Sequence, residues 1–385
     1  MKPERFSEIM ANIKNIKVAV LGDIFLDRIL YVDRSWDEIS VETGLIAYQV
    51  RRKKSVPGAA GVITNIMSDF EAAKIYGLGL LSEDGDGYEL EMGLKARGVD
   101  TTYMIRTSDY FVPTYMKVFF EDQATGHMEE SNRIDTKNRT HLSDEVQDQI
   151  IANIRALKDE VDIFICQEQL EDGECGIFTK RVIDELAKVG AEGKRVIVDS
   201  RYHIQNFQNI IMKCNDLEAL RTLGYKDETK SHDEYMALLD KAVQKLSEER
   251  NYPVIVSCGS DGIKVWEDGE VKTVPAYPVT GELDTCGAGD SALAGISAAL
   301  CGGATVEEAV LFGNLVASMI VQQIGVTGDI TRESFTQRYY DYEKVMGRMY
   351  ITIPVLLVMV NMFLEAEKVP DSSSIRIWAV ELAVP

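Results

Sequence analysis

Short apolar runs alternate with longer segments of helical periodicity along most of the chain. Five runs have the composition of buried strands, and they lie at 16–23, 162–166, 195–200, 209–215 and 253–259. Helical spacing of apolar residues predicts helices at 60–74, 86–97, 143–158, 175–189, 232–249, 287–301 and 305–322. Apolar strands that alternate with helices are typical of a mostly parallel sheet covered on both faces. We therefore predict a doubly wound α/β fold whose ligands bind beyond the carboxyl ends of the strands.

Two segments interrupt this alternation. Residues 28–56 and 101–135 are rich in β-formers and polar residues and lack helical periodicity, so they predict a small β-rich lid inserted into the α/β body. A lid that closes over a site excludes water, which matters most in phosphoryl transfer. We expect one domain at 1–330 and a C-terminal extension of unknown role at 331–385. The apolar stretch at 350–363 contains Pro354 and is too short to span a bilayer.

The charge balance limits the partners of the protein. The chain has 385 residues, with 41 basic and 62 acidic side chains and a formal net charge of −21. This charge repels nucleic acid and anionic membranes, so we expect neither as a partner, and an anionic substrate needs a local basic cluster. The N-terminus lacks the apolar core of a signal peptide, and no run reaches the ~18 apolar residues of a membrane span. We therefore expect a cytoplasmic protein.

The cysteines and histidines show no metal-binding or disulfide pattern in sequence. The six cysteines include no CxxC pair, and they are Cys166, Cys175, Cys214, Cys258, Cys286 and Cys301. The four histidines have no spacing typical of metal ligands, and they are His127, His141, His203 and His232. The spacing therefore predicts buried thiols, solvated or structural histidines, and no zinc site.

The sequence DTCGAGD at 284–290 combines a glycine turn with an acid at the start of a predicted helix. The amides of Gly287, Ala288 and Gly289 would form an anion hole for a transferring phosphoryl group. Asp290 would then take the proton of an attacking hydroxyl as a general base. The alternative is an acid that merely interacts with the helix dipole. Other nucleotide motifs are incomplete, because 77–87 lacks the dinucleotide glycine spacing and 193–195 lacks the Ser/Thr of a P-loop.

This seven-residue motif resembles the D-T-x-G-A-G-D signature of the PfkB carbohydrate kinases in the ribokinase superfamily, in which the last Asp is the catalytic base. The resemblance implies ATP and Mg²⁺ as cofactors and a ribokinase-like fold. In KCNDLE at 213–218, it implies that Asn215 and Glu218 lie near the magnesium and the ATP phosphates, with Glu218 bound to the metal through water. Asp284, together with 324–329, resembles the family's monovalent-cation loop, which would hold K⁺. The resemblance implies further nucleotide contacts at Ser257, Gly259, Gly262 and Asn314.

The N-terminal half most resembles the heptose-phosphate kinase branch of that family, through 22–42, 57–66, 113–118 and 132–135. Asp23 and Asp27 follow a strand and would accept hydrogen bonds from sugar hydroxyls, beside Gly58 and Ala59. Lys117 and Arg133 would supply positive charge to a phosphorylated sugar, unless they are solvated lid charges.

The sequence departs from the family in two places. Gly61 falls where the sugar-binding Asn of the G-G-A-x-N element is expected. Bifunctional relatives add a nucleotidyltransferase with an H-x-G-H element, which has no counterpart here because no histidine follows His232. We therefore expect no second activity from this chain.

These features predict an ATP-dependent kinase for a sugar or sugar phosphate, with a heptose-phosphate-like substrate favoured. The alternatives are a catalytically silent sugar- or nucleotide-binding protein on the same fold, a nucleoside kinase, and a dehydrogenase on a doubly wound sheet. An exposed strand edge in the lid also predicts a homodimer joined through the lids.

Overall fold

The computed structural model describes residues 1–226, 231–250, 252–323 and 330–345. The chain divides into two compact units, Met1–Arg332 and Glu333–Pro385, and the described part of the second unit is helical. The apolar stretch at 350–363 lies outside the described residues. Within the described residues, no helix is both long enough and apolar enough to cross a membrane.

The first unit is built on an eight-stranded sheet with the order β17-β16-β15-β14-β13-β12-β1-β6. Neighbouring strands from β6 to β15 are parallel, and β16 and β17 continue the sheet in antiparallel pairs. The strands are β1 (Lys17–Gly22), β6 (Lys74–Leu78), β12 (Ile163–Glu168), β13 (Arg195–Ser200), β14 (Ile211–Asn215), β15 (Val254–Ser257), β16 (Ile263–Glu267) and β17 (Glu270–Val274). All five predicted strands are present, and their apolar side chains form the core. For example, Val18, Ala19, Val20 and Leu21 of β1 are fully buried.

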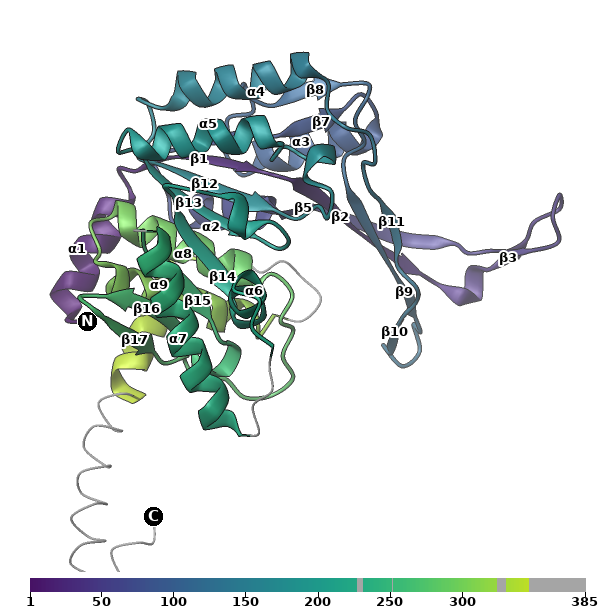
Figure 1. Ribbon diagram of the computed structural model, residues 1–385. Helices are drawn as coiled ribbons and strands as arrows, with labels where there is room; N and C mark the ends of the chain where they lie inside the picture. Colours follow the sequence, from purple (N-terminus) through teal and green to yellow (C-terminus); the bar gives the residue numbers. More distant parts are fainter. Residues whose placement is uncertain (227–230, 251, 324–329, 346–385) are drawn as a thin grey trace, which may run out of the picture. The chain divides into compact units, whose positions relative to one another are not determined.

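Helices cover both faces of this sheet, as the sequence predicts (Figure 1). Helices α4 (Asp144–Leu157) and α5 (Lys180–Ala191) lie over one face, and α8 (Ala288–Cys301) lies over the other, where it contacts α1 (Pro3–Ile13), α2 (Ala60–Asp69) and α9 (Val306–Ile320). The remaining helices are α3 (Gly85–Ala96), α6 (Asp216–Thr222) and α7 (His232–Arg250). Helices α8 and α9 approach closely, since a Cβ at Gly313 would lie 2.7 Å from Ile296 Cγ1.

Two of the predicted helix boundaries are wrong. Helix α5 begins at Lys180 rather than 175, because the Thr179 side chain caps it and the preceding residues form a loop with a short 3₁₀ turn, η2 (Gly173–Cys175). Helix α2 ends at Asp69, because the chain turns and enters β6 at Lys74. The sequence analysis also missed α1, although its length of 11 residues is similar to that of α2, and the short α6, whose seven residues span too few periods for their apolar spacing to stand out.

The chain order of the strands creates a switch point in the sheet. From β1 the chain runs outward to β6, and it then returns to the other side of β1 for β12, β13, β14 and β15. The carboxyl ends of β1 and β12 therefore flank a crevice from which the connections leave in opposite directions. In open α/β sheets this is the place where ligands bind.

A second sheet forms the predicted lid, and it grows directly from the end of β1. Strand β2 (Ile24–Val32) pairs antiparallel with β5 (Val50–Ala59) and parallel with β9 (Thr114–Glu121). Strands β10 (Met128–Glu130) and β11 (Ile134–Thr136) pair with β9, and β3 (Glu38–Ile39) and β4 (Ile46–Ala47) form a separate hairpin. In Figure 1 this sheet projects away from the helices of the body. Within 101–135, β8 (Ile105–Thr107) instead pairs with β7 (Leu80–Ser82).

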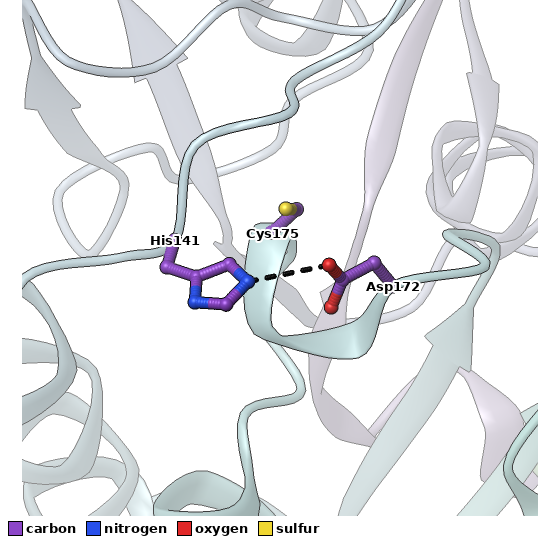
Figure 2. A group of neighbouring side chains, drawn as sticks. All are labelled: His141, Asp172 and Cys175. Atoms are coloured by element: carbon purple, nitrogen blue, oxygen red, sulfur yellow. Dashed lines mark hydrogen bonds and ion pairs between the residues drawn. The ribbon is translucent and has the colours of Figure 1, made fainter.

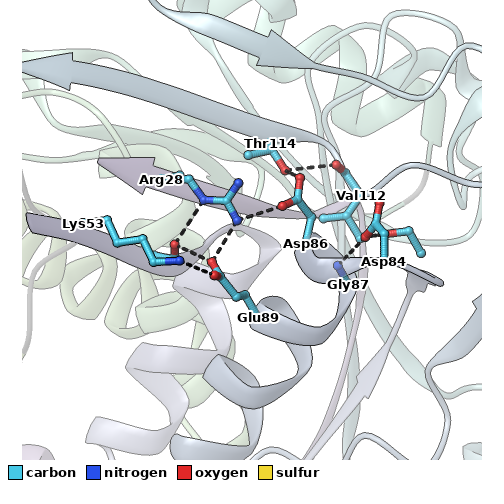
Figure 3. Close-up of polar contacts among 10 residues, drawn as sticks. Arg28, Lys53, Asp84, Asp86, Gly87, Glu89, Val112 and Thr114 are labelled. Carbon is cyan, nitrogen blue, oxygen red and sulfur yellow. Dashed lines mark hydrogen bonds and ion pairs between the residues drawn. The ribbon is translucent and has the colours of Figure 1, made fainter. Parts of the chain in front are cut away.

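The base of the lid is held to α3 by a cluster of charged side chains (Figure 3). Arg28 Nη2 of β2 lies 2.7 Å from Asp86 Oδ1 and 2.8 Å from Glu89 Oε2. Lys53 Nζ of β5 lies 2.8 Å from Glu89 Oε1, and Thr114 Oγ1 of β9 donates to Asp86 Oδ2 at 3.1 Å. Three strands of the lid thus share two carboxylates at the start of one helix, which orients the lid relative to the sheet.

We expect Arg28→Met to destabilise the protein by about 1–3 kcal/mol, because it leaves two partly buried carboxylates without their shared cation. Lys53→Met is the matched control, since Lys53 also pairs with Glu89 but its side chain is 62% exposed against 14% for Arg28. Its effect should stay within about 0.5 kcal/mol. The measurement is urea unfolding of both variants. Equal losses would contradict a special role of Arg28 at the base of the lid.

Candidate active site

The carboxyl-terminal halves of β12, β13 and β14 bring three polar side chains to Asp290 in the first turn of α8. The Gln167 side-chain amide at the end of β12 donates to Asp290 Oδ1. Lys213 of β14 pairs with Asp199 of β13, which lies directly opposite it in the sheet register. Asp290 is the predicted base, whereas sequence reasoning missed Gln167, Asp199 and Lys213. A lysine inside the apolar run IIMKCN was the available signal, because a buried lysine needs a partner.

The glycine turn before α8 presents free backbone amides to this cluster. Gly287 is the N-cap of α8 and has φ +76°, a left-handed conformation that glycine adopts without strain. Within the described part of the chain, the amides of Gly287, Gly289 and Asp290 have no hydrogen-bond acceptor. A Cβ at Gly289 would lie 3.2 Å from Lys213 Nζ, so the ammonium group is adjacent to the turn. Free amides, a helix N-terminus and a cation together favour a bound anion.

Burial and neighbouring charges shift the protonation of these groups. Burial is the main cause that raises the pKa of Asp290; together with Asp199, and against the opposing effect of Lys213, it brings the pKa to about 7. Burial alone lowers the pKa of Lys213, but Asp199, Asp290 and Glu218 outweigh it, so the net pKa is raised and the ammonium stays charged. A carboxyl that titrates near neutral pH is well matched to take and release a proton.

Asn215 and Glu218 form a capping box at the start of α6. Glu218 N donates to Asn215 Oδ1 and Asn215 N donates to Glu218 Oε2, both at 2.8 Å. The pKa of Glu218 is raised, first by burial and then by Asp199, so the two carboxylates lie near each other. Ser257 of β15 lies opposite Asn215 in the register, and its hydroxyl donates to the Cys214 carbonyl at 3.3 Å.

The glycine turn after β15 lies at the same edge of the sheet. Gly262 has φ +97°, and a Cβ there would lie 2.1 Å from the Val274 carbonyl, so no other residue fits. Gly259 also has a positive φ and open space beside it. Asn314 of α9 donates its amide to the carbonyls of Val274 at 2.8 Å and Pro275 at 3.2 Å. Its amide protons therefore fix the end of β17 and the residue after it. A nucleotide contact at Asn314 stays a prediction.

At the base of the lid, Asp27, Lys117 and Arg133 come together. Burial raises the pKa of Asp27, while Lys117 and Arg133 oppose this shift. A Cβ at Gly58 would lie 2.3 Å from Asp27 Oδ2, so glycine is required for the carboxylate to occupy this position. The Arg133 guanidinium lies 4.1 Å from the centroid of the Tyr115 ring and pairs with Asp135 at 2.7 Å.

The charged groups of the lid and of the body act on one another. Asp27 raises the pKa of Asp290, and the thiol of Cys286 in the glycine motif is affected by both Lys117 and Asp27. The lid base and the turn before α8 therefore face a common space. Arg201, just after β13, also lowers the pKa of Asp290 and was not predicted from sequence.

The structure gives Asp23 a different role from the expected contact with sugar hydroxyls. The residue is 2% exposed, its Oδ1 accepts from Ile177 N and its Oδ2 accepts from Gln169 N, both at 3.1 Å. Burial raises its pKa to about 6. Asp23 thus holds the β12–α5 loop against the end of β1, and a substrate contact of Asp27 stays a prediction.

Residues 59–61 also differ from expectation. Ala59 has φ +51° and ψ −120°, a conformation that favours glycine, so it stands where a second glycine would be least strained. A Cβ at Gly61 would lie 2.5 Å from Pro57 Cβ. A side chain at position 61 would therefore meet Pro57, so local packing favours glycine here.

Asp284 lies at the start of the glycine motif, and its Oδ1 accepts from the Cys286 amide at 2.9 Å. Its amide donates to the Val321 carbonyl, which brings it to the end of α9. The other half of the expected cation loop, 324–329, lies outside the described residues. A monovalent-cation site at Asp284 therefore stays a prediction.

Comparison with known proteins places these features in a family. The model of the pfkB family carbohydrate kinases matches residues 15–332. The bifunctional protein HldE from Nitratiruptor sp. is 26% identical over 312 residues, which is 80% of this chain and 62% of that protein. HldE from Bradyrhizobium sp. is 28% identical over 332 residues, 85% of this chain and 64% of that protein. The chain therefore spans less than two thirds of the length of these relatives.

Solved structures share the fold. Ribokinase from Arabidopsis thaliana, complexed with ribose and ATP, has a TM-score of 0.57 and 20% identity, and the match covers 84% of this chain and 98% of that one. Phosphofructokinase-2 from Escherichia coli, in complex with substrates and products, has a TM-score of 0.62 and 16% identity, over 85% of this chain and 99% of that one. The predicted ribokinase-like fold is confirmed.

We expect the raised pKa of Asp290 to appear in the pH dependence of stability. The folded chain holds this proton up to about pH 7, whereas the unfolded chain releases it near 3.8, so ionisation disfavours the folded state. The free energy of unfolding of the wild type, relative to Asp290→Asn, should fall as pH rises between these values and then stay level. Urea unfolding across this range measures the difference, and parallel profiles for the two proteins would contradict it.

Proposed function

Because the chain belongs to the pfkB family of carbohydrate kinases, we propose that it transfers the γ-phosphoryl group of ATP to a hydroxyl of a sugar or sugar phosphate. The observation that supports this most is the position of Asp290 in the first turn of α8, beside free amides and a buried lysine. A carboxyl that only stabilised the helix dipole would not need these neighbours or a pKa near 7.

In the proposed mechanism, each group acts on a different part of the reaction. Gln167 holds one oxygen of Asp290 and leaves the other to take the proton of the substrate hydroxyl. As the hydroxyl oxygen bonds to the γ-phosphorus, the bond from that phosphorus to the β–γ bridging oxygen breaks, ADP leaves, and charge spreads over the transferring group. The amides of Gly287 and Gly289 and the ammonium of Lys213 stabilise that charge. The proton stays on Asp290 until the product leaves.

The donor set near α6 fits a hydrated Mg²⁺. Glu218 and Asp199 are carboxylates close enough for Asp199 to raise the pKa of Glu218, and a cation between them would relieve this repulsion. Mg²⁺ prefers oxygen ligands and keeps several waters. When bound, it would neutralise charge on the ATP phosphates. Glu218 and Asp199 would hold it, in part through water.

A phosphorylated sugar is the substrate class that we favour. Lys117 and Arg133 place two cations beside Asp27, so one part of the lid base suits a phosphate and another suits a hydroxyl. The resemblance of 22–42, 57–66, 113–118 and 132–135 to the heptose-phosphate kinase branch supports a heptose-phosphate-like sugar. The second activity of the bifunctional relatives is not proposed for this chain.

The proposed homodimer and cytoplasmic location stay predictions. The hairpin formed by β3 and β4 and the 3₁₀ turn before it expose several large apolar side chains, which would suit a lid-to-lid contact, and they are Trp36, Ile39, Val41, Leu45 and Ile46.

We expect Asp290→Asn to lower kcat by about 10²- to 10⁴-fold, because the substrate hydroxyl loses its proton acceptor. ADP release over a panel of sugars and sugar phosphates is the assay. Asp233→Asn is the matched control, since Asp233 is likewise an acid in the first turn of a helix, α7, but is exposed. Unchanged turnover by Asp290→Asn would disprove the mechanism. ATP binding without turnover on any sugar, by the wild type, would favour the catalytically silent alternative.

We expect Lys117→Met to raise KM for the best sugar phosphate by roughly ten- to hundredfold, the range for a hydrogen bond between charged groups. KM for an unphosphorylated sugar should change little. Lys54→Met removes the same charge from an exposed position on β5 of the lid and serves as the control. Equal effects of Lys117→Met on phosphorylated and unphosphorylated sugars would contradict a phosphate-binding role.

A further inference from the structure

His141, Asp172 and Cys175 lie together outside the candidate active site, although their spacing in sequence shows no metal-binding pattern (Figure 2). Their ligand atoms, a ring nitrogen, a carboxylate oxygen and a sulfur, all lie within 4.8 Å of one another. His141 precedes α4, and the other two residues flank and end the η2 turn between β12 and α5. The fold thus brings three different metal-ligating groups together from two separate segments.

We propose that His141, Asp172 and Cys175 form a binding site for a divalent ion of the zinc class. Nitrogen, oxygen and thiolate sulfur are the ligands that Zn²⁺ accepts together, whereas Mg²⁺ and Ca²⁺ require oxygen ligands. On binding, the Cys175 thiol releases its proton to solvent and its sulfur bonds to the metal. The charges of the thiolate and the carboxylate then balance the two charges of the ion, and water occupies the fourth position.

Backbone contacts hold the two segments in place without a metal. Leu142 N donates to the Glu174 carbonyl at 3.1 Å, and Asn138 Nδ2 donates to the Cys175 carbonyl at 2.7 Å. Within the turn, Glu174 N donates to Asp172 Oδ1 at 3.1 Å. The other oxygen, Oδ2, faces His141 Nε2 at 3.3 Å. The turn therefore uses one carboxylate oxygen and directs the second towards the proposed ion.

Only a small movement is needed to close the site. Tetrahedral zinc with these ligands places the donor atoms about 3.3–3.8 Å apart. Cys175 is 4% exposed and cannot move far, but the side chains of His141 and Asp172 are 68% and 59% exposed and can rotate towards it. A buried sulfur with two exposed partners leaves the ion accessible from solvent.

The surroundings favour a cation. A cavity of about 520 Å³ adjoins Asp172, and five of its lining side chains are carboxylates, namely Glu168, Glu171, Asp172, Glu174 and Asp184. The site also adjoins the contact that holds the end of β1. Gly176 follows Cys175, and a Cβ there would lie 2.6 Å from Asp23 Oδ1, while Ile177 N donates to the same oxygen. A bound ion would thus connect two segments. One carries His141 and follows the lid strands, and the other is the β12–α5 loop, whose backbone amides bind Asp23.

The test is metal binding by the full chain after removal of metals with a chelator, without any activity readout. One equivalent of Co²⁺ should produce a thiolate-to-cobalt charge-transfer band, and Zn²⁺ should displace it. Competition with a chromophoric chelator then gives the zinc affinity. His141→Gln should weaken zinc binding at least about tenfold. Loss of a residue that only orients a ligand already lowers metal affinity by about this factor, and loss of the ligand itself should lower it more. Cys175→Ser should abolish the charge-transfer band.

His232→Gln is the matched control, because His232 Nε2 also lies near an aspartate oxygen, 3.0 Å from Asp261 Oδ1. Among the described residues, no cysteine joins this pair to form a group of three potential metal ligands. The zinc affinity of His232→Gln should equal that of the wild type. His141 is exposed, so His141→Gln keeps the test valid even if Cys175→Ser misfolds. The proposal is overturned if the wild type shows no charge-transfer band, or if His141→Gln binds zinc as tightly as the wild type. Neither result bears on kinase activity.

Discussion

The ion pair between Lys213 and Asp199, buried at the carboxyl ends of two neighbouring strands, is the interaction on which the candidate site depends. A lysine that is 2% exposed stays charged only because several carboxylates surround it. Those same carboxylates would repel a phosphate if the lysine were absent. In the proposed mechanism, Lys213 thus lets one crevice hold both the acid that takes the proton, Asp290, and the anionic phosphoryl group, close to the N-terminus of α8.

The lid is coupled to this crevice by strand β2, whose side chains alternate between the two faces of the lid sheet. Strand β2 continues from β1, and successive side chains of a strand point to opposite faces. Asp27 therefore lies with the cations of the proposed substrate site, while Arg28 binds the carboxylates of α3. The contact that orients the lid and the group that would meet the substrate are adjacent in sequence. Movement of the lid relative to α3 would necessarily move Asp27.

The loop between β12 and α5 joins three parts of the molecule. Its backbone amides hold Asp23 at the start of the lid, and the preceding strand end carries Gln167, which holds Asp290. Its η2 turn carries two of the three proposed metal ligands. An ion bound there would restrict a loop that contacts both the lid base and the strand that carries Gln167. This gives the proposed metal a structural effect without placing it in the reaction.

The sequence alone determined the α/β class, the five buried strands, the lid segments and the family, because periodic burial and the glycine–acid motif are local properties of the chain. It also located Asp290, whose neighbours in sequence form the turn beside it. Only the tertiary structure decided that Asp23 accepts hydrogen bonds from two backbone amides, that a side chain at position 61 would meet Pro57, and that Gln167, Asp199 and Lys213 surround Asp290. It likewise brought His141 to Cys175, where spacing predicts no metal site. Side chains from different strands and loops meet through sheet register and loop packing, and no local pattern encodes those distances.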